Sequence, residues 1–286
     1  MKCFTAQILL CFTFIILSIS SIHAQIAHTE DTLVQKKVRQ NIFKRTSQDA
    51  LLTGETILAS YKRPFSWKKK EWLLFSGTLV TVGAASCLDR PVYRYMQNNQ
   101  TRLKNKFASF GDFMGQPENN YPFMLGLITV GEVINNEWMR DTGIMLVASV
   151  TASGVLQTIA KTVVGRSRPS RGEEFSRNFR PFKSLPGSHS FPSGHSMLAL
   201  SVHWILARQT NFIPLKIVFY SVPAIVSWSR VYDNAHWFSD ILLGNALGIA
   251  FGEAVLHIYP KLKERKNLKG LGLTTTSNGL GLQYKF

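Results

Sequence analysis

The chain is long, rich in apolar residues and strongly basic. It has 286 residues, of which 45% are hydrophobic and 17% charged, with 33 Lys and Arg against 17 Asp and Glu. A chain of this length and apolar content can bury a sizeable core, which excludes a wholly disordered protein. The net charge of +16 indicates an anionic partner, such as nucleic acid, an anionic lipid or a phosphorylated substrate.

The first residues have the pattern of an export signal. Lys2 precedes the apolar run at residues 8–17, and small residues follow up to Ala24. This pattern predicts a signal peptide over residues 1–24; the alternative is a signal segment that is retained as a membrane anchor. With that segment removed, Cys87 is the remaining cysteine, so an internal disulfide and cysteine-based metal sites are excluded. We expect Cys87 to be a small buried hydrophobic residue.

The remainder predicts an all-α fold with polar ends. Residues 25–70 read as a polar, basic N-terminal arm with at most one short helix, and residues 71–262 as a helical domain. Within this domain, uncharged runs predict a bundle of about six helices. These runs are residues 72–88, 119–131, 142–160, 190–207, 217–229 and 241–252. The longest runs approach the roughly 20 residues needed to cross a bilayer. We therefore expect a membrane-embedded bundle, with a bundle of buried core helices as the alternative.

The C-terminal residues 263–286 differ from the rest. A basic helix end at residues 261–269 leads into two alternating apolar and polar stretches, with Asn278-Gly279 between them. This arrangement predicts a short β-hairpin or a surface tail.

Three clusters of polar residues stand beside predicted helix ends. They are Lys161 with Arg168-Pro169, then Pro192-Ser193-Gly194-His195, and then Ser229-Arg230 with His236 and Asp240. If successive helices alternate in direction, all three clusters lie at one end of the bundle. Free backbone N–H groups of Ser193, Gly194 and His195 would form an anion site at a helix N-terminus.

The residue types in these clusters suit phosphoryl transfer. Arg, Lys and backbone donors stabilise the charge on the phosphoryl oxygens. A histidine can attack phosphorus while a second histidine protonates the leaving oxygen. His236 and Asp240 are four residues apart, a spacing that on a helix lets the carboxylate hold the imidazole. Such chemistry requires no metal or other cofactor.

The pattern K-x6-RP, PSGH and SR-x5-H-x3-D resembles the type-2 phosphatidic acid phosphatase superfamily, which includes bacterial acid phosphatases, lipid phosphate phosphatases and vanadium haloperoxidases. The resemblance covers about residues 120–258, with every motif position present and in order. It implies that His236 forms a phosphohistidine and that Asp240 fixes its tautomer, with His195 as the general acid. It also implies phosphate binding by Lys161, Arg168, Ser193, Gly194 and Arg230.

Two further histidines and one loop lie outside this pattern. His203, about two turns after His195, is expected to be a core histidine, whereas His189 is a candidate for substrate contact. Between Lys161 and Lys183 seven basic residues face two acidic ones. This segment is either a solvated loop or an electrostatic funnel for phosphates.

The sequence as a whole predicts a metal-independent phosphatase that hydrolyses phosphate monoesters or pyrophosphates of lipids. Its partners would be a phosphorylated lipid or small phosphoester and the membrane, without nucleic acid. We expect an exported protein in the inner membrane, with the site facing the periplasm. The alternatives are a soluble periplasmic acid phosphatase of broad specificity, a vanadium haloperoxidase, and a non-catalytic basic protein that binds membranes or nucleic acid. The substrate and the oligomeric state remain open.

Overall fold

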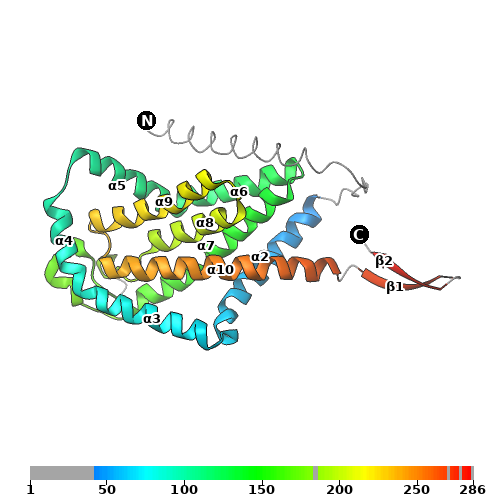
Figure 1. Cartoon of the computed structure of the whole chain (residues 1–286), viewed down its shortest axis with the longest axis horizontal. Coiled ribbons are helices and arrows are strands. Elements are labelled where there is room, and N and C mark those ends of the chain that lie inside the picture. The colour runs from blue at the N-terminus through cyan, green and yellow to red at the C-terminus, as the bar shows by residue number, and fades with distance from the viewer. Residues whose placement is uncertain (1–41, 183–185, 269–270, 277–278, 285–286) are drawn as a thin grey trace. The chain divides into compact units, whose positions relative to one another are not determined.

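The computed structural model describes residues 42–182, 186–268, 271–276 and 279–284. These residues form a helical bundle and one β-hairpin, in agreement with the predicted all-α class (Figure 1). The predicted signal segment at residues 1–24 lies outside the described residues. The α-helices and strands are α2 (Ile42–Lys62), α3 (Lys69–Ala85), α4 (Asp89–Asn98), α5 (Arg102–Gly115), α6 (Pro117–Val133), α7 (Glu137–Val164), α8 (Gly194–Gln209), α9 (Ile213–Tyr232), α10 (Phe238–Leu268), β1 (Leu271–Thr276) and β2 (Gly279–Tyr284).

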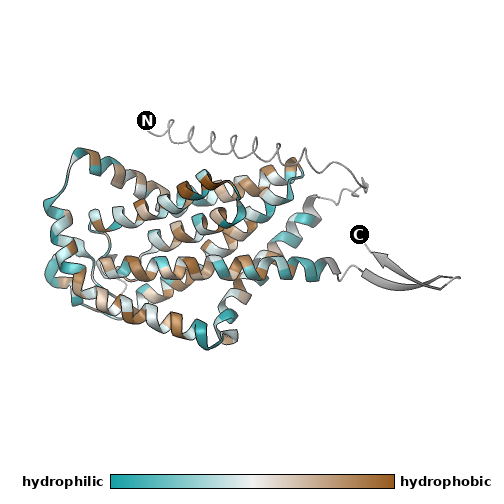
Figure 2. Ribbon diagram, in the orientation of Figure 1, coloured by the Kyte–Doolittle hydropathy of each residue, from teal (hydrophilic) through white to brown (hydrophobic). Residues whose placement is uncertain are grey.

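All six helices that the uncharged runs predict are present, as α3 and α6–α10. Helices α7, α8, α9 and α10 lie side by side in the bundle, and α6 packs against α7 (Figure 1). The described residues include three further α-helices, α2, α4 and α5. Sequence reading missed α4 and α5 because they are short and rich in charge, and it expected at most a short helix where α2 has 21 residues. In Figure 2 the ribbon of α4 is coloured largely as hydrophilic, whereas the bundle helices include more hydrophobic residues.

Local chemistry fixes both ends of α7, the helix that leads to the first motif. At its start, the Asn136 side chain accepts a hydrogen bond from the backbone N–H of Met139. At its end, Gly165 adopts a φ of +60°, and a Cβ there would lie 1.9 Å from the carbonyl oxygen of Arg180. Only glycine fits this turn, which directs the chain from α7 to Arg166 and Arg168.

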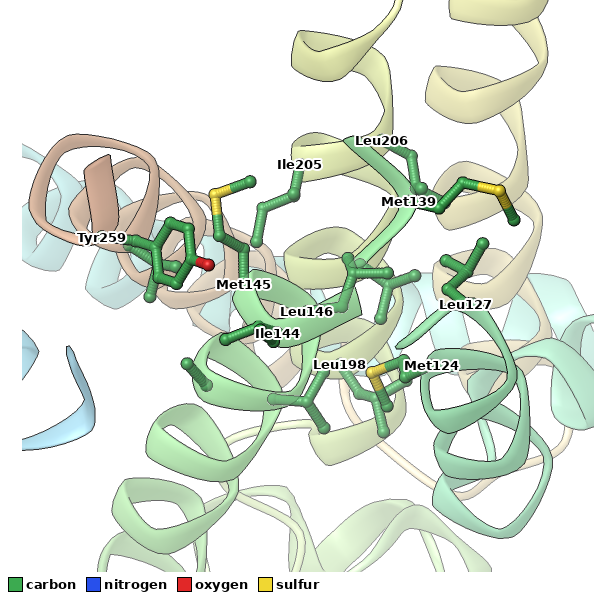
Figure 3. Packing of buried hydrophobic residues seen from close by; sticks show 14 of the residues in the cluster. Met124, Leu127, Met139, Ile144, Met145, Leu146, Leu198, Ile205, Leu206 and Tyr259 are labelled. Carbon is green, nitrogen blue, oxygen red and sulfur yellow. The ribbon is translucent and has the colours of Figure 1, made fainter. Parts of the chain in front are cut away.

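The core of the bundle lies where α6, α7, α8 and α10 meet. Met124, Ile144, Leu146 and Ile205 are almost completely buried there, and Figure 3 shows their side chains packed between the helices. Tyr259 of α10 closes one side of this cluster. Burying side chains of this size stabilises a fold by about 1.5–3 kcal/mol each. The core therefore holds the helix ends that carry the motifs in fixed positions.

Three helical segments are long and apolar enough to cross a membrane: residues 69–98, 137–164 and 238–266. The first is almost entirely unburied, with Leu73, Leu74 and Val80 more than 60% exposed on α3. Soluble monomers rarely expose an apolar surface of this kind, and a bilayer would cover it. The chain thus has the helices of an integral membrane protein.

Two peripheral predictions have different outcomes. The predicted buried Cys87 is wrong, because this free cysteine is exposed in the short 3₁₀ helix between α3 and α4. The predicted hairpin is present: β1 and β2 are antiparallel, and Leu271 pairs with Tyr284. Residues 277–278, which connect the strands, lie outside the described residues. Helix α10 continues to Leu268, past the predicted domain boundary at residue 262.

Candidate active site

The three motifs meet at one end of the bundle, as the topology predicted. The first follows the C-terminus of α7, the second forms the start of α8, and the third spans the end of α9 and the start of α10. Backbone hydrogen bonds join them: Ser190 N–H donates to the carbonyl of Arg166 (3.0 Å), and Ser193 N–H donates to the carbonyl of Asp240 (3.1 Å). The motifs are therefore parts of one site.

The predicted nucleophile, His236, is buried with a defined tautomer. Its Nδ1 lies 2.6 Å from the backbone carbonyl oxygen of Ser190, which can only accept a hydrogen bond. Nδ1 must then carry the proton, and Nε2 keeps its lone pair free. Burial lowers the pKa of His236 well below 6.5, and the charges of Lys161 and Arg168 lower it further. The ring is thus held neutral, the form that a nucleophile needs.

The predicted direct contact between His236 and Asp240 is wrong. Nδ1 of His236 and Oδ2 of Asp240 are 3.9 Å apart, too far for a hydrogen bond. Helix α10 begins at Phe238, so His236 precedes the helix and the helical i,i+4 geometry does not apply. Ser190 connects the two residues instead, because its carbonyl bonds His236 and its hydroxyl donates to Asp240 (2.5 Å). Asp240 is thus linked to the predicted nucleophile through Ser190.

Asp240 also belongs to a buried ion-pair cluster that sequence reading missed. Arg166 donates to Asp240 (2.5 Å) and to Asp89 (2.6 Å), and Asp89 accepts bonds from the backbone N–H and hydroxyl of Ser239. Arg166 was grouped with the basic loop, but it is only 3% exposed and joins the first motif to the third. Asp89 comes from the start of α4, and no motif in the sequence points to it.

The predicted acid, His195, lies in the first turn of α8 and faces Asp112 of α5. Its Nε2 is 3.4 Å from Oδ1 of Asp112. Burial lowers the pKa of His195 to about 4, with Arg230, Lys161 and Arg168 contributing in the same direction and Asp112 opposing them. A phosphate bound beside this ring would favour its protonated form. Asp112 is the second acidic residue that sequence reading missed.

Arg230 also donates hydrogen bonds to acidic side chains. Its Nη1 donates to Asp112 (2.5 Å), its Nη2 to Asp233 (2.8 Å) and its Nε to the hydroxyl of Ser229 (3.1 Å). Each terminal nitrogen retains a second hydrogen, since a guanidinium has five N–H groups. Arg230 therefore keeps two donors for a phosphate while Asp112 and Asp233 fix its orientation.

Lys161 and Arg168 differ from the other cations of the site. Across the described part of the chain, neither side chain has an acidic partner, and the Nε of Arg168 is buried without a hydrogen bond. Burial and the charge of Arg230 lower the pKa of Arg168. Two cations that lack counterions at the same helix end form an anion site that is ready for its ligand.

The start of α8 supplies backbone donors to the same site. The amides of Gly194 and His195 begin the helix and have no hydrogen-bond partner among the described residues, but Ser193 N–H is already bonded to Asp240. This corrects the prediction of three free amides to two. The Ser193 hydroxyl is fully buried and lies 3.0 Å from that of Ser196.

The two further histidines and the basic loop residues differ in their positions relative to the site. His203 is a core histidine as expected, 4% exposed, with Nδ1 2.8 Å from the carbonyl of Ala199. His189 has a buried Nε2 that lacks a hydrogen bond within the described residues, and its contact with substrate stays a prediction. Arg171 and Arg177 are exposed on the loop after the first motif, as a funnel would require, while Lys183 lies outside the described residues.

Comparisons with known proteins find a family match over the part of the chain that carries the three motifs. Residues 142–264 match the PAP2 superfamily. These residues form a PAP2-like domain. The PAP2 domain contains all three motifs, whereas Asp112 and Asp89 lie in helices that precede the matched residues.

Curated relatives of the PAP2 domain include two lipid phosphatases. The chain is 29% identical over 120 residues to a lipid A 1-phosphatase of Rhizobium etli, covering 42% of this chain and 51% of that protein. It is 31% identical over 109 residues to an undecaprenyl-diphosphatase of Sulfolobus acidocaldarius, covering 38% and 51%. The chain thus spans about half the length of these relatives.

A solved structure shares the fold. The first transmembrane PAP2 type phosphatidylglycerolphosphate phosphatase from Bacillus subtilis aligns with 68% of this chain and 98% of its own, at 23% identity and a TM-score of 0.53. The aligned part is longer than the stretch matched to the family, so the likeness in fold extends beyond residues 142–264.

Proposed function

We propose that this protein is a metal-independent phosphatase that hydrolyses phosphate monoesters or pyrophosphates of lipids through a phosphohistidine intermediate. The observation that carries the proposal is the neutral His236, with Nε2 free, beside the unpaired Lys161 and Arg168. A phosphoryl group bound by these cations would lie next to a nucleophile of the correct tautomer. The relatives named lipid A 1-phosphatase and undecaprenyl-diphosphatase support a lipid substrate.

The reaction has two steps. His236 Nε2 attacks phosphorus while the bond to the leaving oxygen breaks, and His195 gives that oxygen its proton. Lys161, Arg168, Arg230 and the free amides at the start of α8 stabilise the charge on the equatorial oxygens. Water then attacks the phosphohistidine, with His195 now accepting the proton of that water. Phosphate leaves, and His236 returns to its neutral form.

Replacing the nucleophile tests this proposal. His236→Ala should reduce turnover of a lipid phosphate and of p-nitrophenyl phosphate by at least about 1,000-fold, because covalent catalysis is lost. His257→Ala, which changes an exposed histidine on α10, is the matched control and should leave both rates unchanged. Wild-type activity should also survive a chelator. Unchanged turnover in His236→Ala would overturn the mechanism, and a need for added divalent metal would overturn metal independence.

We further propose that the site faces the periplasm. Basic residues gather at the ends of α3 and α10 remote from the site, at Lys69, Lys70, Lys263 and Lys266. The positive-inside rule places such residues in the cytoplasm. An introduced cysteine at Arg177 offers a direct test, since this side chain is exposed on the loop after the first motif. In a Cys3→Ser, Cys11→Ser, Cys87→Ser background, a maleimide that cannot cross the inner membrane should label Arg177→Cys in intact spheroplasts. Labelling only after lysis would contradict this orientation.

A further inference from the structure

A cavity of about 170 Å³ adjoins the phosphate site between α6, α7 and α8. Lys161 and His195 form its polar end, and Tyr121, Val150 and Leu198 contribute to its apolar wall. In the proposed reaction His195 protonates the leaving oxygen, so the group attached to that oxygen must extend from His195. The cavity lies beside this ring, partly open to the outside, and it fits the role of leaving-group pocket.

The pocket wall contains three neutral polar side chains, and only one of them lacks a hydrogen bond among the described residues. The hydroxyl of Tyr121 is 3.1 Å from that of Thr151, and the hydroxyl of Ser153 donates to the carbonyl of Val150 (3.1 Å). The carboxamide of Gln157 has no such partner within residues 42–182 and 186–268. Its two N–H donors and its oxygen therefore remain available to a ligand.

The position of Gln157 places this amide next to the reacting groups. It precedes Lys161 by one helical turn on α7, so both side chains project from the same face. It also packs on Gly194: a Cβ at this glycine would lie 2.5 Å from both Oε1 and Nε2 of Gln157. Gly194 is followed directly by His195, whose ring lines the same cavity. The amide is therefore held between the phosphate-binding lysine and the acid.

We propose that Gln157 is a specificity-determining residue that hydrogen-bonds a neutral polar group of the leaving alcohol, next to the scissile phosphate. This rests on the proposed phosphatase function. A hydroxyl or an acylamide, as on a sugar or polyol headgroup, matches the donors and acceptor of a carboxamide. A second phosphate does not, because Lys161 is the only Lys or Arg in the cavity wall and the scissile phosphate already uses it. The preferred substrate class is thus a phosphate monoester of a lipid with a sugar or polyol headgroup, rather than a prenyl diphosphate.

The size of the pocket agrees with a headgroup as its occupant. Pockets that enclose whole drug-sized ligands measure about 300–1,000 Å³. A cavity of about 170 Å³ takes the group next to the phosphate, and the acyl chains remain outside it.

Substrate competition in the purified full chain tests this inference. Three substrates are compared in detergent micelles: a lipid with its phosphate on an N-acylated sugar, farnesyl phosphate, and farnesyl diphosphate. Gln157→Met removes the amide while nearly preserving shape. It should lower kcat/KM for the sugar lipid relative to farnesyl phosphate by about 10- to 100-fold, since a polar group of the substrate loses its partner. Gln157→Asn, which retains the amide on a shorter chain, should fall between Gln157→Met and wild type.

The matched control is Thr158→Val, on the exposed side of the same helix, where the hydroxyl bonds only the carbonyl of Gly154. It should leave the ratio of the two kcat/KM values unchanged. An unchanged ratio in Gln157→Met, or a loss confined to the diphosphate, would overturn the role of Gln157. If wild type and Thr158→Val hydrolyse none of the three substrates, the phosphatase function itself fails, a result distinct from a failure at Gln157.

Discussion

Helix α7 carries a cation near each of its ends, Arg140 buried and Lys161 partly buried, and their surroundings differ. At its start, Arg140 lies 3.6 Å from a carboxylate oxygen of Asp49, 3.5 Å from one of Glu132 and 3.8 Å from one of Asp141. About 30 Å further along the helix, Lys161 has no acidic partner within the described residues. A compensated cation holds helices together, whereas an uncompensated one is arranged for the charge of a ligand.

The site end repeats this contrast at short range. Arg166 and Arg168 are two residues apart, yet Arg166 is bonded to Asp89 and Asp240 while Arg168 has no carboxylate partner among the described residues. We propose a structural role for Arg166 and phosphate binding for Arg168. The presence or absence of a carboxylate partner distinguishes these two arginines more clearly than their positions in the sequence do.

Among the cations, removal of an uncompensated one gives the largest expected effect on catalysis. Arg168→Met should lower kcat/KM by about 100- to 1,000-fold, the loss typical of one donor to a transition-state oxyanion. Its thermal unfolding temperature should be unchanged or higher, because burial and Arg230 already disfavour the charge of Arg168. Steady-state kinetics with a lipid phosphate and a melting curve check both parts. A marked loss of stability would assign Arg168 to the scaffold.

Removal of the compensated cation should have the opposite profile. Arg140→Met leaves Asp49, Glu132 and Asp141 without their shared partner and should destabilise the fold by about 3 kcal/mol. The kcat of the protein that remains folded should stay near the wild-type value, since the change lies at the remote end of α7. Denaturant unfolding in micelles measures the first quantity and active-site titration the second. A large fall in kcat would contradict the proposal that the cation at the start of α7 is structural and the cation at its end binds the ligand.

The pH dependence tests the state of the two histidines. His236 has a pKa lowered well below 6.5, so it remains a neutral nucleophile into the acidic range. His195, with a pKa lowered to about 4, loses its acidic proton as pH rises above that value. For a lipid phosphate, kcat/KM should therefore fall by up to about tenfold per pH unit on the alkaline side, with an optimum below pH 6.5. An optimum at alkaline pH would contradict these roles.

Asp112 should modulate this profile. Its charge raises the pKa of His195, so Asp112→Asn should move the alkaline limb to lower pH. It also removes a charged partner of Arg230, and we expect a loss of about tenfold in kcat/KM at neutral pH. Asp233→Asn, which changes the other carboxylate on Arg230, is the matched control, since it does not contact His195. An identical pH shift in both variants would show that Asp112 acts through Arg230 alone.

The sequence predicted the motif residues because their spacing places them at successive helix ends. The six apolar runs indicated which helices pack, and the alternation of their directions brought Lys161, His195 and His236 to one end. The contact between His236 and Asp240 failed because the spacing assumed a helix through both residues, and α10 starts two residues too late.

The acidic partners could not be predicted in the same way. Asp89 and Asp112 reach the site from α4 and α5. These two helices are short and contain charged residues, so a search for apolar runs does not detect them. Each becomes significant only through a contact distant in sequence, with Arg166 and with Arg230. Cys87 was expected to be buried among apolar neighbours, but those neighbours belong to α3, whose apolar face is itself exposed.

Trapping of the phosphorylated enzyme tests the central claim most directly. In His195→Ala, p-nitrophenyl phosphate still phosphorylates the nucleophile, because its leaving group needs no proton, while the water that must release the phosphate lacks its base. Rapid quenching at alkaline pH, where a phosphohistidine survives, followed by peptide mass spectrometry should find the phosphoryl group on His236. A phosphoryl group on another residue, or none while p-nitrophenol is released in a burst, would contradict the account.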